Sequence, residues 1–158
     1  MSTNRRSEDG GETLAYYDRH ASRYVRETRN VDMSPLYQPF LDLLPEGGRI
    51  LDAGCGSGRD SRAFLARGYD VTAIDGSPAM VAHAAEATGI LVRYLRFEDI
   101  AYEDEFDGVW ACASLLHVPK SRIDGVLRRL SRALKVGGIL HVSFKDGHPF
   151  NGRVLPEA

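Results

Sequence analysis

Cysteine is scarce in this chain of 158 residues, which contains two, Cys55 and Cys112. Two thiols exclude a disulfide framework and favour a reducing compartment, so we expect a cytoplasmic protein. Long apolar runs are missing as well, since none approaches the roughly 20 residues of a membrane span. The polar first residues also lack the apolar core of a signal peptide. We therefore expect no association with a membrane.

An excess of charge of one sign is also missing. The chain has 20 Lys and Arg residues against 22 Asp and Glu residues, a net charge of −2. Because nucleic-acid binding depends on basic residues that neutralise phosphates, this balance argues against a nucleic acid as partner. Metal-ligand spacings such as CxxC and HExxH do not occur, so no metal site is expected.

The chain is long enough for one domain and too short for two. Its 43% hydrophobic and 27% charged residues are ordinary for a globular protein. Residues 1–12 are rich in glycine, serine and charge, which predicts a disordered leader. We expect the domain itself over residues 13–145 and an irregular tail over residues 146–158.

The hydrophobic periodicity changes along the chain. From Thr13 onwards, apolar residues recur at helical spacing, and a second helix is predicted over residues 34–44, with Pro35 in its first turn. Short apolar segments then alternate with helical ones. Strands are predicted over 49–54, 70–75, 90–95 and 139–144 and within 106–114, and helices over 59–67, 78–87 and 119–134. Because parallel strands need such crossovers, we expect an α/β fold: a doubly wound, mainly parallel sheet with helices on both faces.

The clearest motif is a glycine-rich bend at the end of the first predicted strand. Ligands of doubly wound sheets bind beyond the carboxyl ends of the strands, and Asp52–Gly58 reads DAGCGSG there. Its glycines permit a tight turn and a close approach of a ligand to the backbone. Asp75 ends the second strand, where its carboxylate can accept hydrogen bonds from a ribose diol. A mere strand-to-helix turn is the alternative, but the matching position of Asp75 favours a nucleotide-type ligand.

Two nucleotide-type ligands compete for this bend. A dinucleotide fingerprint, GxGxxG/A, aligned on Gly54 and Gly56 would place Arg59 where a small residue is needed for close packing. Asp52 would repel a pyrophosphate but attract the positively charged amino group of an amino-acid moiety. An NAD-dependent oxidoreductase is therefore the weaker alternative.

The stretch LDAGCGSGRDSRAFLARGYDVTAID, residues 51–75, resembles the first motif and second strand of class I S-adenosylmethionine-dependent methyltransferases. With YYDRHASRY (16–24) and SLLHVP (114–119), the pattern over about residues 14–145 resembles the small-molecule branch that includes tellurite-resistance-type enzymes. The resemblance implies a Rossmann-like fold, S-adenosylmethionine as cofactor, and methyl transfer to a small-molecule substrate.

The resemblance also implies which residues hold the cofactor. Asp52, Gly54 and Gly56 would line its methionine part, and Asp75 would hold the ribose. Further residues on the cofactor side would be Cys55, Arg59, Gly76, Ser77, Ala113, Tyr16 and Tyr24. Packing in the core is the alternative for the tyrosines, and burial as an inert thiol is the alternative for Cys55.

The adenine would lie against the next strand ends. Met80 would pack on the ring, or it belongs to the helix core. Of the acidic pair Glu98 and Asp99, Asp99 is favoured as the contact to the adenine amino group, with Phe97 or Ile100 as walls. A pair of solvated loop acids is the alternative.

Two ionisable residues are candidates for contact with other groups. His117 follows the fourth strand and could take a proton from the acceptor as a general base, or it is a structural histidine at a strand–helix junction. Arg59 could reach a carboxylate of cofactor or substrate, or it is a solvated arginine in a first helical turn.

The resembled fold usually continues beyond the fifth strand with a helix and an antiparallel hairpin. Here the turn-rich segment KDGHPFNGRVLPEA follows instead, so we expect a C-terminally shortened fold. Its fifth strand would be an open edge, or nearly so, and the chain would be naturally short, a fragment, or covered at that edge by a partner chain. We expect the protein to form a homo-oligomer through that edge or the adjoining face. A catalytically weak S-adenosylmethionine-binding module is therefore an alternative function.

Overall fold

The computed structural model describes residues 33–143 and 153–154. The predicted leader and the helix that begins at Thr13, with Tyr16 and Tyr24, lie outside the described residues. None of the helices in the described part is long and apolar enough to cross a bilayer.

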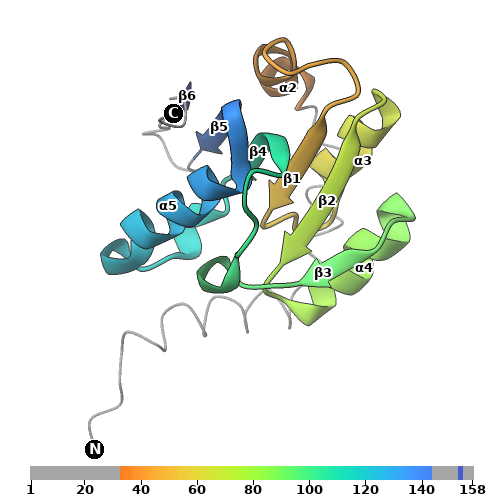
Figure 1. Ribbon diagram of the computed structural model, residues 1–158. Helices are drawn as coiled ribbons and strands as arrows, with labels where there is room; N and C mark the ends of the chain where they lie inside the picture. The colour runs from red at the N-terminus through yellow and green to blue at the C-terminus, as the bar shows by residue number, and fades with distance from the viewer. Residues whose placement is uncertain (1–32, 144–152, 155–158) are drawn as a thin grey trace, which may run out of the picture.

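A single sheet organises the described residues. Its strands are β1 (Arg49–Ala53), β2 (Asp70–Asp75), β3 (Val92–Tyr94), β4 (Phe106–Cys112), β5 (Leu134–Ser143) and β6 (Arg153–Val154). They lie in the order β3-β2-β1-β4-β5-β6. The first five strands are parallel, and β6 pairs antiparallel with β5 (Figure 1). The prediction of a doubly wound, mainly parallel sheet is confirmed.

Helices cover both faces of this sheet, as predicted. They are α2 (Ser34–Leu41), α3 (Arg59–Ala66), α4 (Pro78–Thr88) and α5 (Ile123–Ala133), with short 3-10 turns η1 (Phe97–Asp99), η2 (Leu115–His117) and η3 (Lys120–Arg122). Successive strand residues belong to different cores: Ile50 packs with the residues of α2, α3 and α4, and Leu51 packs with those of α5. This alternation follows from the two-residue period of a strand.

Several element boundaries differ from the prediction. The second helix ends at Leu41 rather than residue 44, and α5 begins at Ile123 because η3 takes the residues after Pro119. The third strand is shorter than predicted, and Leu91 before it is 86% exposed. The reason is its place at the edge of the sheet, where one side of the strand has no neighbour to bury it.

The fifth strand begins five residues earlier than predicted, at Leu134. Its register against β4 is interrupted, because Phe106 pairs with Leu134 but Gly108 pairs with Ile139. The intervening residues therefore form a bulge that includes the Gly137-Gly138 pair.

The expected open edge of β5 needs a correction. Leu140 pairs with Val154 and His141 pairs with Arg153, so β6 covers part of this edge. The segment predicted to be an irregular tail thus contains a strand of two residues. Its prolines and glycines exclude a long strand, but Arg153 and Val154 are neither, and two residues suffice for a short antiparallel pairing. Self-association through the rest of this edge or the adjoining face stays a prediction.

A glycine in the middle of β4 lets α2 approach the sheet closely. A Cβ atom on Gly108 would lie 2.6 Å from Cζ of Phe40 and 3.0 Å from a methyl carbon of Leu44. Both of these side chains are buried. Gly108 therefore provides the space into which the aromatic ring and the leucine pack.

The strand order fixes where a ligand can bind. The chain runs outwards from β1 to β2 and β3, and then returns to the other side of β1 with β4. The order therefore reverses between β1 and β4, and the crevice beyond the carboxyl ends of these two strands is the expected binding position.

Candidate functional site

The glycine-rich bend follows β1 directly and leads into α3. Gly54, Gly56 and Gly58 all have positive φ angles, of +78°, +54° and +84°. The backbone N–H groups of Gly54 and Cys55 both donate to the carbonyl oxygen of Ile74, at 3.0 and 2.9 Å. The bend is thus anchored to the end of β2 by main-chain hydrogen bonds.

Gly54 also lies against the segment that follows β4. A Cβ atom at this position would be 2.5 Å from Cβ of Ser114 and 3.1 Å from Cζ of Phe97. The hydroxyl group of Ser114, itself buried, donates to the carbonyl oxygen of Ala53 at 2.8 Å. Only glycine fits at position 54. The ends of β1 and β4, between which the strand order reverses, are therefore held in contact.

Asp75 joins the bend to the start of α4. Its Oδ2 accepts a hydrogen bond from the N–H group of Gly56 at 2.8 Å, and its Oδ1 accepts one from Ser77 at 2.9 Å. The carboxylate is half-buried. The structure therefore brings together three residues that were predicted from separate strand ends, with Gly76 between two of them.

Asp52 lies inside the same region and is 2% exposed. The Ser61 hydroxyl donates to its Oδ2 at 2.6 Å. Burial, followed by the charge of Asp60, raises the pKa of Asp52 to about 8, and Ser61 and Arg59 counteract the rise only in part. A positively charged ligand group beside Asp52 would favour its ionised form.

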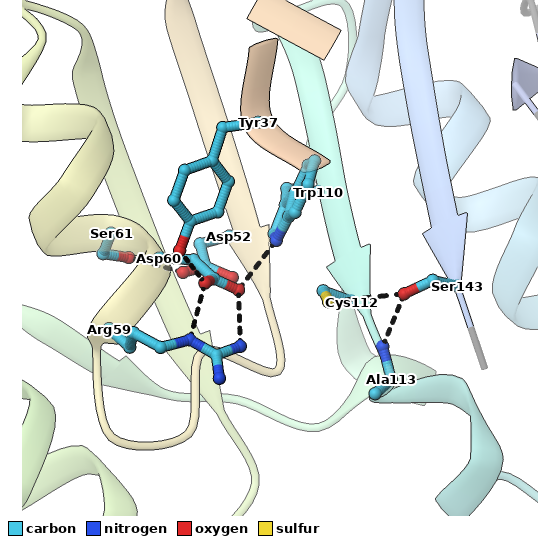
Figure 2. A network of polar contacts seen from close by, with 9 residues as sticks. All are labelled: Tyr37, Asp52, Arg59, Asp60, Ser61, Trp110, Cys112, Ala113 and Ser143. Carbon is cyan, nitrogen blue, oxygen red and sulfur yellow. Dashed lines mark hydrogen bonds and ion pairs between the residues drawn. The ribbon is translucent and has the colours of Figure 1, made fainter. Parts of the chain in front are cut away.

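Arg59 does not behave as a solvated first-turn arginine. Its Nε donates to Oδ1 of Asp60 at 2.9 Å and its Nη2 to Oδ2 at 3.5 Å (Figure 2). Burial lowers the pKa of Arg59, but the hydrogen bonds and charge of Asp60 outweigh this effect and raise the pKa above its ordinary value. The guanidinium group is thus held beside the end of β1.

Asp60, which the sequence did not single out, is the centre of this network. It also accepts hydrogen bonds from the Tyr37 hydroxyl group and, at 2.8 Å, from Nε1 of Trp110. These partners come from α2 and β4 (Figure 2). No sequence pattern links them, although a carboxylate in the first turn after a glycine bend is a signal for a helix N-terminus.

The end of β4 is strained. Ala113 has a φ angle of +55°, which is unusual for a residue with a side chain. Its N–H group donates to the carbonyl oxygen of Ser143 at 2.9 Å and lies 3.1 Å from the Ser143 hydroxyl oxygen. Ser143, another residue missed by the sequence reading, therefore holds Ala113 in place beside the order reversal.

His117, the predicted general base, ends η2 and is half-buried. It lies three residues beyond Ser114, on the carboxyl side of β4. The structure thus places it in the segment that borders the crevice, and its role as a base stays a prediction.

The residues predicted to lie near the adenine have different environments in the structure. Met80 is 2% exposed and lies at the start of α4, where its N–H group donates to the Ser77 hydroxyl group that caps the helix. Ile100 belongs to the core under α5, so Phe97, whose ring reaches Gly54, is the better wall.

The acidic pair of η1 is exposed. Glu98 lies 3.7 Å from Arg122 in a surface ion pair, so its carboxylate already has a partner. Asp99, the favoured contact, stays the candidate for the adenine amino group.

Both thiols are free, and neither has the environment of a nucleophile. Burial, followed by the charge of Asp52, raises the pKa of Cys55, and burial and the charge of Asp60 raise that of Cys112 to about 11. The Cys55 side chain packs in the core under α2, α3 and α4. Contact between Cys55 and a cofactor therefore rests on its backbone alone.

A groove of about 300 Å³ is formed by the end of the glycine bend, α3 and the last turn of α4. It is lined by Ser57, Gly58, Arg59, Arg62, Ala63, Ala66 and Ala87. Apart from Arg59, it shares no residue with the predicted cofactor contacts. Among the residues that the structure describes, no cluster of His, Cys, Asp and Glu could hold a metal ion.

Comparison with known proteins shows which proteins this chain is related to. The chain is 33% identical over 118 residues to the putative methyltransferase YqeM of Bacillus subtilis, covering 68% of this chain and 48% of the relative. It is 38% identical over 115 residues to a ubiquinone biosynthesis O-methyltransferase of Xanthomonas axonopodis pv. citri, covering 68% and 47%. The chain thus spans about half the length of these curated relatives.

Solved structures share the fold. A TehB-like SAM-dependent methyltransferase from Corynebacterium glutamicum superposes with a TM-score of 0.70 at 24% identity, covering 81% of this chain and 74% of that one. A DhpI–SAM–HEP complex superposes with a TM-score of 0.70 at 26% identity, covering 94% and 70%. A family model described as a methyltransferase domain matches residues 50–138, more than half of the chain. The chain therefore belongs to the methyltransferase domain family and has the Rossmann-like fold of class I methyltransferases.

Proposed function

We propose that the chain binds S-adenosylmethionine at the carboxyl ends of β1, β2 and β4 and transfers its methyl group to a small-molecule acceptor. The observation that carries this proposal is the Asp75 carboxylate. It is held by the N–H groups of Gly56 and Ser77, 2.8 and 2.9 Å away, at the point where a ribose would meet the glycine bend. The DhpI relative, whose structure contains SAM, supports this choice of cofactor.

The donor set fits this cofactor better than a dinucleotide. Asp52 is a buried carboxyl group next to the bend, and burial raises its pKa because no full counter-charge offsets the desolvation. A pyrophosphate would add negative charge there, whereas the ammonium group of a methionine moiety supplies the missing positive charge. Tight binding of NAD is therefore not expected.

Methyl transfer requires the protein mainly to align the acceptor with the methyl group. When bound, S-adenosylmethionine supplies a methyl group already activated by its sulfonium. The protein residues have to orient the acceptor behind that methyl group and exclude water. Ala113 and Ser114 lie where such an acceptor would be positioned, at the end of β4, and we assign to His117 the removal of a proton from the acceptor.

The surroundings of the site support a small acceptor in a reducing compartment. Both cysteines are free, as expected for a cytoplasmic protein. The net charge of −2 disfavours a nucleic-acid substrate. Membership of the tellurite-resistance-type branch also belongs to this proposal, since the family model does not distinguish branches.

The test is transfer of labelled methyl groups. Wild-type protein with methyl-labelled S-adenosylmethionine should label compounds in a fraction of small metabolites, and His117→Gln should reduce this labelling about 100-fold or more if His117 is the base. Binding of the cofactor without any labelling would instead indicate an S-adenosylmethionine-binding module. Full labelling by His117→Gln across the pH range would remove His117 from the role of base.

A further inference from the structure

We propose that Asp60 is a positioning residue that presents the Arg59 guanidinium group to the carboxylate of the cofactor's methionine moiety. This role rests on the proposed function and deepens it, because it names the residues that recognise the amino-acid end of the ligand.

The Asp60 carboxylate has a fixed orientation. It is 7% exposed and is held by the hydroxyl group of Tyr37 and by Nε1 of Trp110, at 2.8 Å. Tyr37 and Trp110 are themselves 4% and 0% exposed. Donors from α2 and from β4 therefore lock the carboxylate between two elements (Figure 2).

Arg59 is held from the other side of this carboxylate. Asp60 accepts from Nε at 2.9 Å and from Nη2 at 3.5 Å, which occupies two of the five N–H groups of the planar fork. The remaining nitrogen, Nη1, points away from Asp60 and past the end of β1 (Figure 2). The Arg59 side chain is 24% exposed, so a ligand can reach these N–H groups.

The charges of Asp52 and Arg59 are complementary to the ammonium and carboxylate groups of an amino acid. Asp52 lies close enough to Arg59 for the positive charge to lower the pKa of the carboxyl group in part. An α-amino acid carries one ammonium and one carboxylate group, so Asp52 can receive the first and Arg59 the second. Guanidinium groups bind carboxylates through paired, charge-assisted hydrogen bonds, which only a well-oriented arginine can supply.

Two ligands isolate this contact. S-adenosylhomocysteine carries the amino-acid end, and 5′-methylthioadenosine has the same adenosine and thioether but lacks it. Calorimetric titration should show that Arg59→Gln weakens S-adenosylhomocysteine binding about 10- to 100-fold and leaves 5′-methylthioadenosine binding unchanged. Arg59→Lys, which keeps the charge but not the fork, should restore part of the loss.

Asp60→Asn should act in the same direction without touching the ligand. Loss of the carboxylate frees the guanidinium group, so S-adenosylhomocysteine binding should weaken about 3- to 10-fold at constant 5′-methylthioadenosine affinity. Should Asp60→Asn fail to fold, Trp110→Phe removes one donor to Asp60 and keeps a ring in the core. Arg62→Gln is the matched control, because it removes an exposed charge from the same helix.

The outcomes separate the two proposals. An unchanged ratio of the two affinities in Arg59→Gln, including an equal loss for both ligands, would overturn the role of Asp60 and Arg59, because a structural defect would weaken both ligands alike. Wild-type protein that binds neither ligand would contradict the proposed function itself.

Discussion

Asp52 is a carboxyl group whose burial sets the electrostatics of the site. Its pKa is raised from 3.8 to about 8 by desolvation and then by the charge of Asp60. In the unfolded chain, the same group loses its proton near pH 4. Between about pH 4 and pH 8 the folded state therefore holds a proton that the unfolded state has lost, so the free energy of unfolding falls as the pH rises through this window.

Asp52→Asn should remove this dependence. We expect the free energy of unfolding at pH 8 to rise by up to ~5 kcal/mol, because the pKa is raised by about four units and each unit costs ~1.4 kcal/mol once the group must ionise. Urea denaturation at pH 5, 6.5 and 8 measures it, with the exposed Asp99→Asn as the control. A slope against pH that matches wild-type protein would show that Asp52 ionises freely.

The site residues at the strand ends could be predicted from the sequence, whereas the buried hydrogen-bond network around Asp60 could not. The pairing of Gly56 with Asp75 follows from the topology, since the ends of neighbouring parallel strands must meet. The bonds from Tyr37 and Trp110 to Asp60 span 23 and 50 residues and join α2 and β4 to the first turn of α3. No local pattern encodes such contacts, because they depend on how α2 packs on the sheet.

At the scale of elements, the packing of α2 on β4 depends on Gly108. Gly108→Ala would push a Cβ atom to 2.6 Å from Phe40, whose ring is 1% exposed and has no room to move. We expect the free energy of unfolding to fall by ~1–3 kcal/mol, as for other overpacked cores.

A second glycine provides the matched control. Gly125 lies inside α5, and a Cβ atom there would meet nothing within 4 Å. Gly125→Ala should therefore raise the free energy of unfolding by ~0.5–1 kcal/mol, because alanine is the better helix former. Chemical denaturation of the two variants compares them directly, and destabilisation of equal size would contradict this account of the packing.

Elements with a clear period were predicted best. β2 spans residues 70–75 as predicted, because a short apolar segment between turn residues leaves little choice of boundary. The predicted start of β5 was wrong because the first residues of the strand pair with β4 before a bulge, and hydrophobic periodicity does not reveal a bulge. β6 was missed since two residues carry no period at all.

At the scale of the whole molecule, the sheet brings four separate segments together at the carboxyl ends of its strands. The reversal of strand order between β1 and β4 places the glycine bend, Asp75, η1 and the residues after β4 around one crevice. Local signals in the sequence identified these segments, and the parallel topology is what makes them one site. β6 is not among these segments, because it pairs with β5 at the opposite end of the sheet from β3.

The central claim is that Asp75 and the glycine bend bind an adenosyl ligand. Calorimetric titration of S-adenosylhomocysteine tests it most directly, with Asp75→Asn as the variant and Asp70→Asn as the control, since Asp70 is exposed at the other end of the same strand. We predict that wild-type protein and Asp70→Asn bind one ligand per chain with similar affinity, and that Asp75→Asn binds about 10- to 100-fold more weakly, because the ribose loses charge-assisted hydrogen bonds. Equal affinity of Asp75→Asn and wild-type protein, or no binding by either, would contradict the claim.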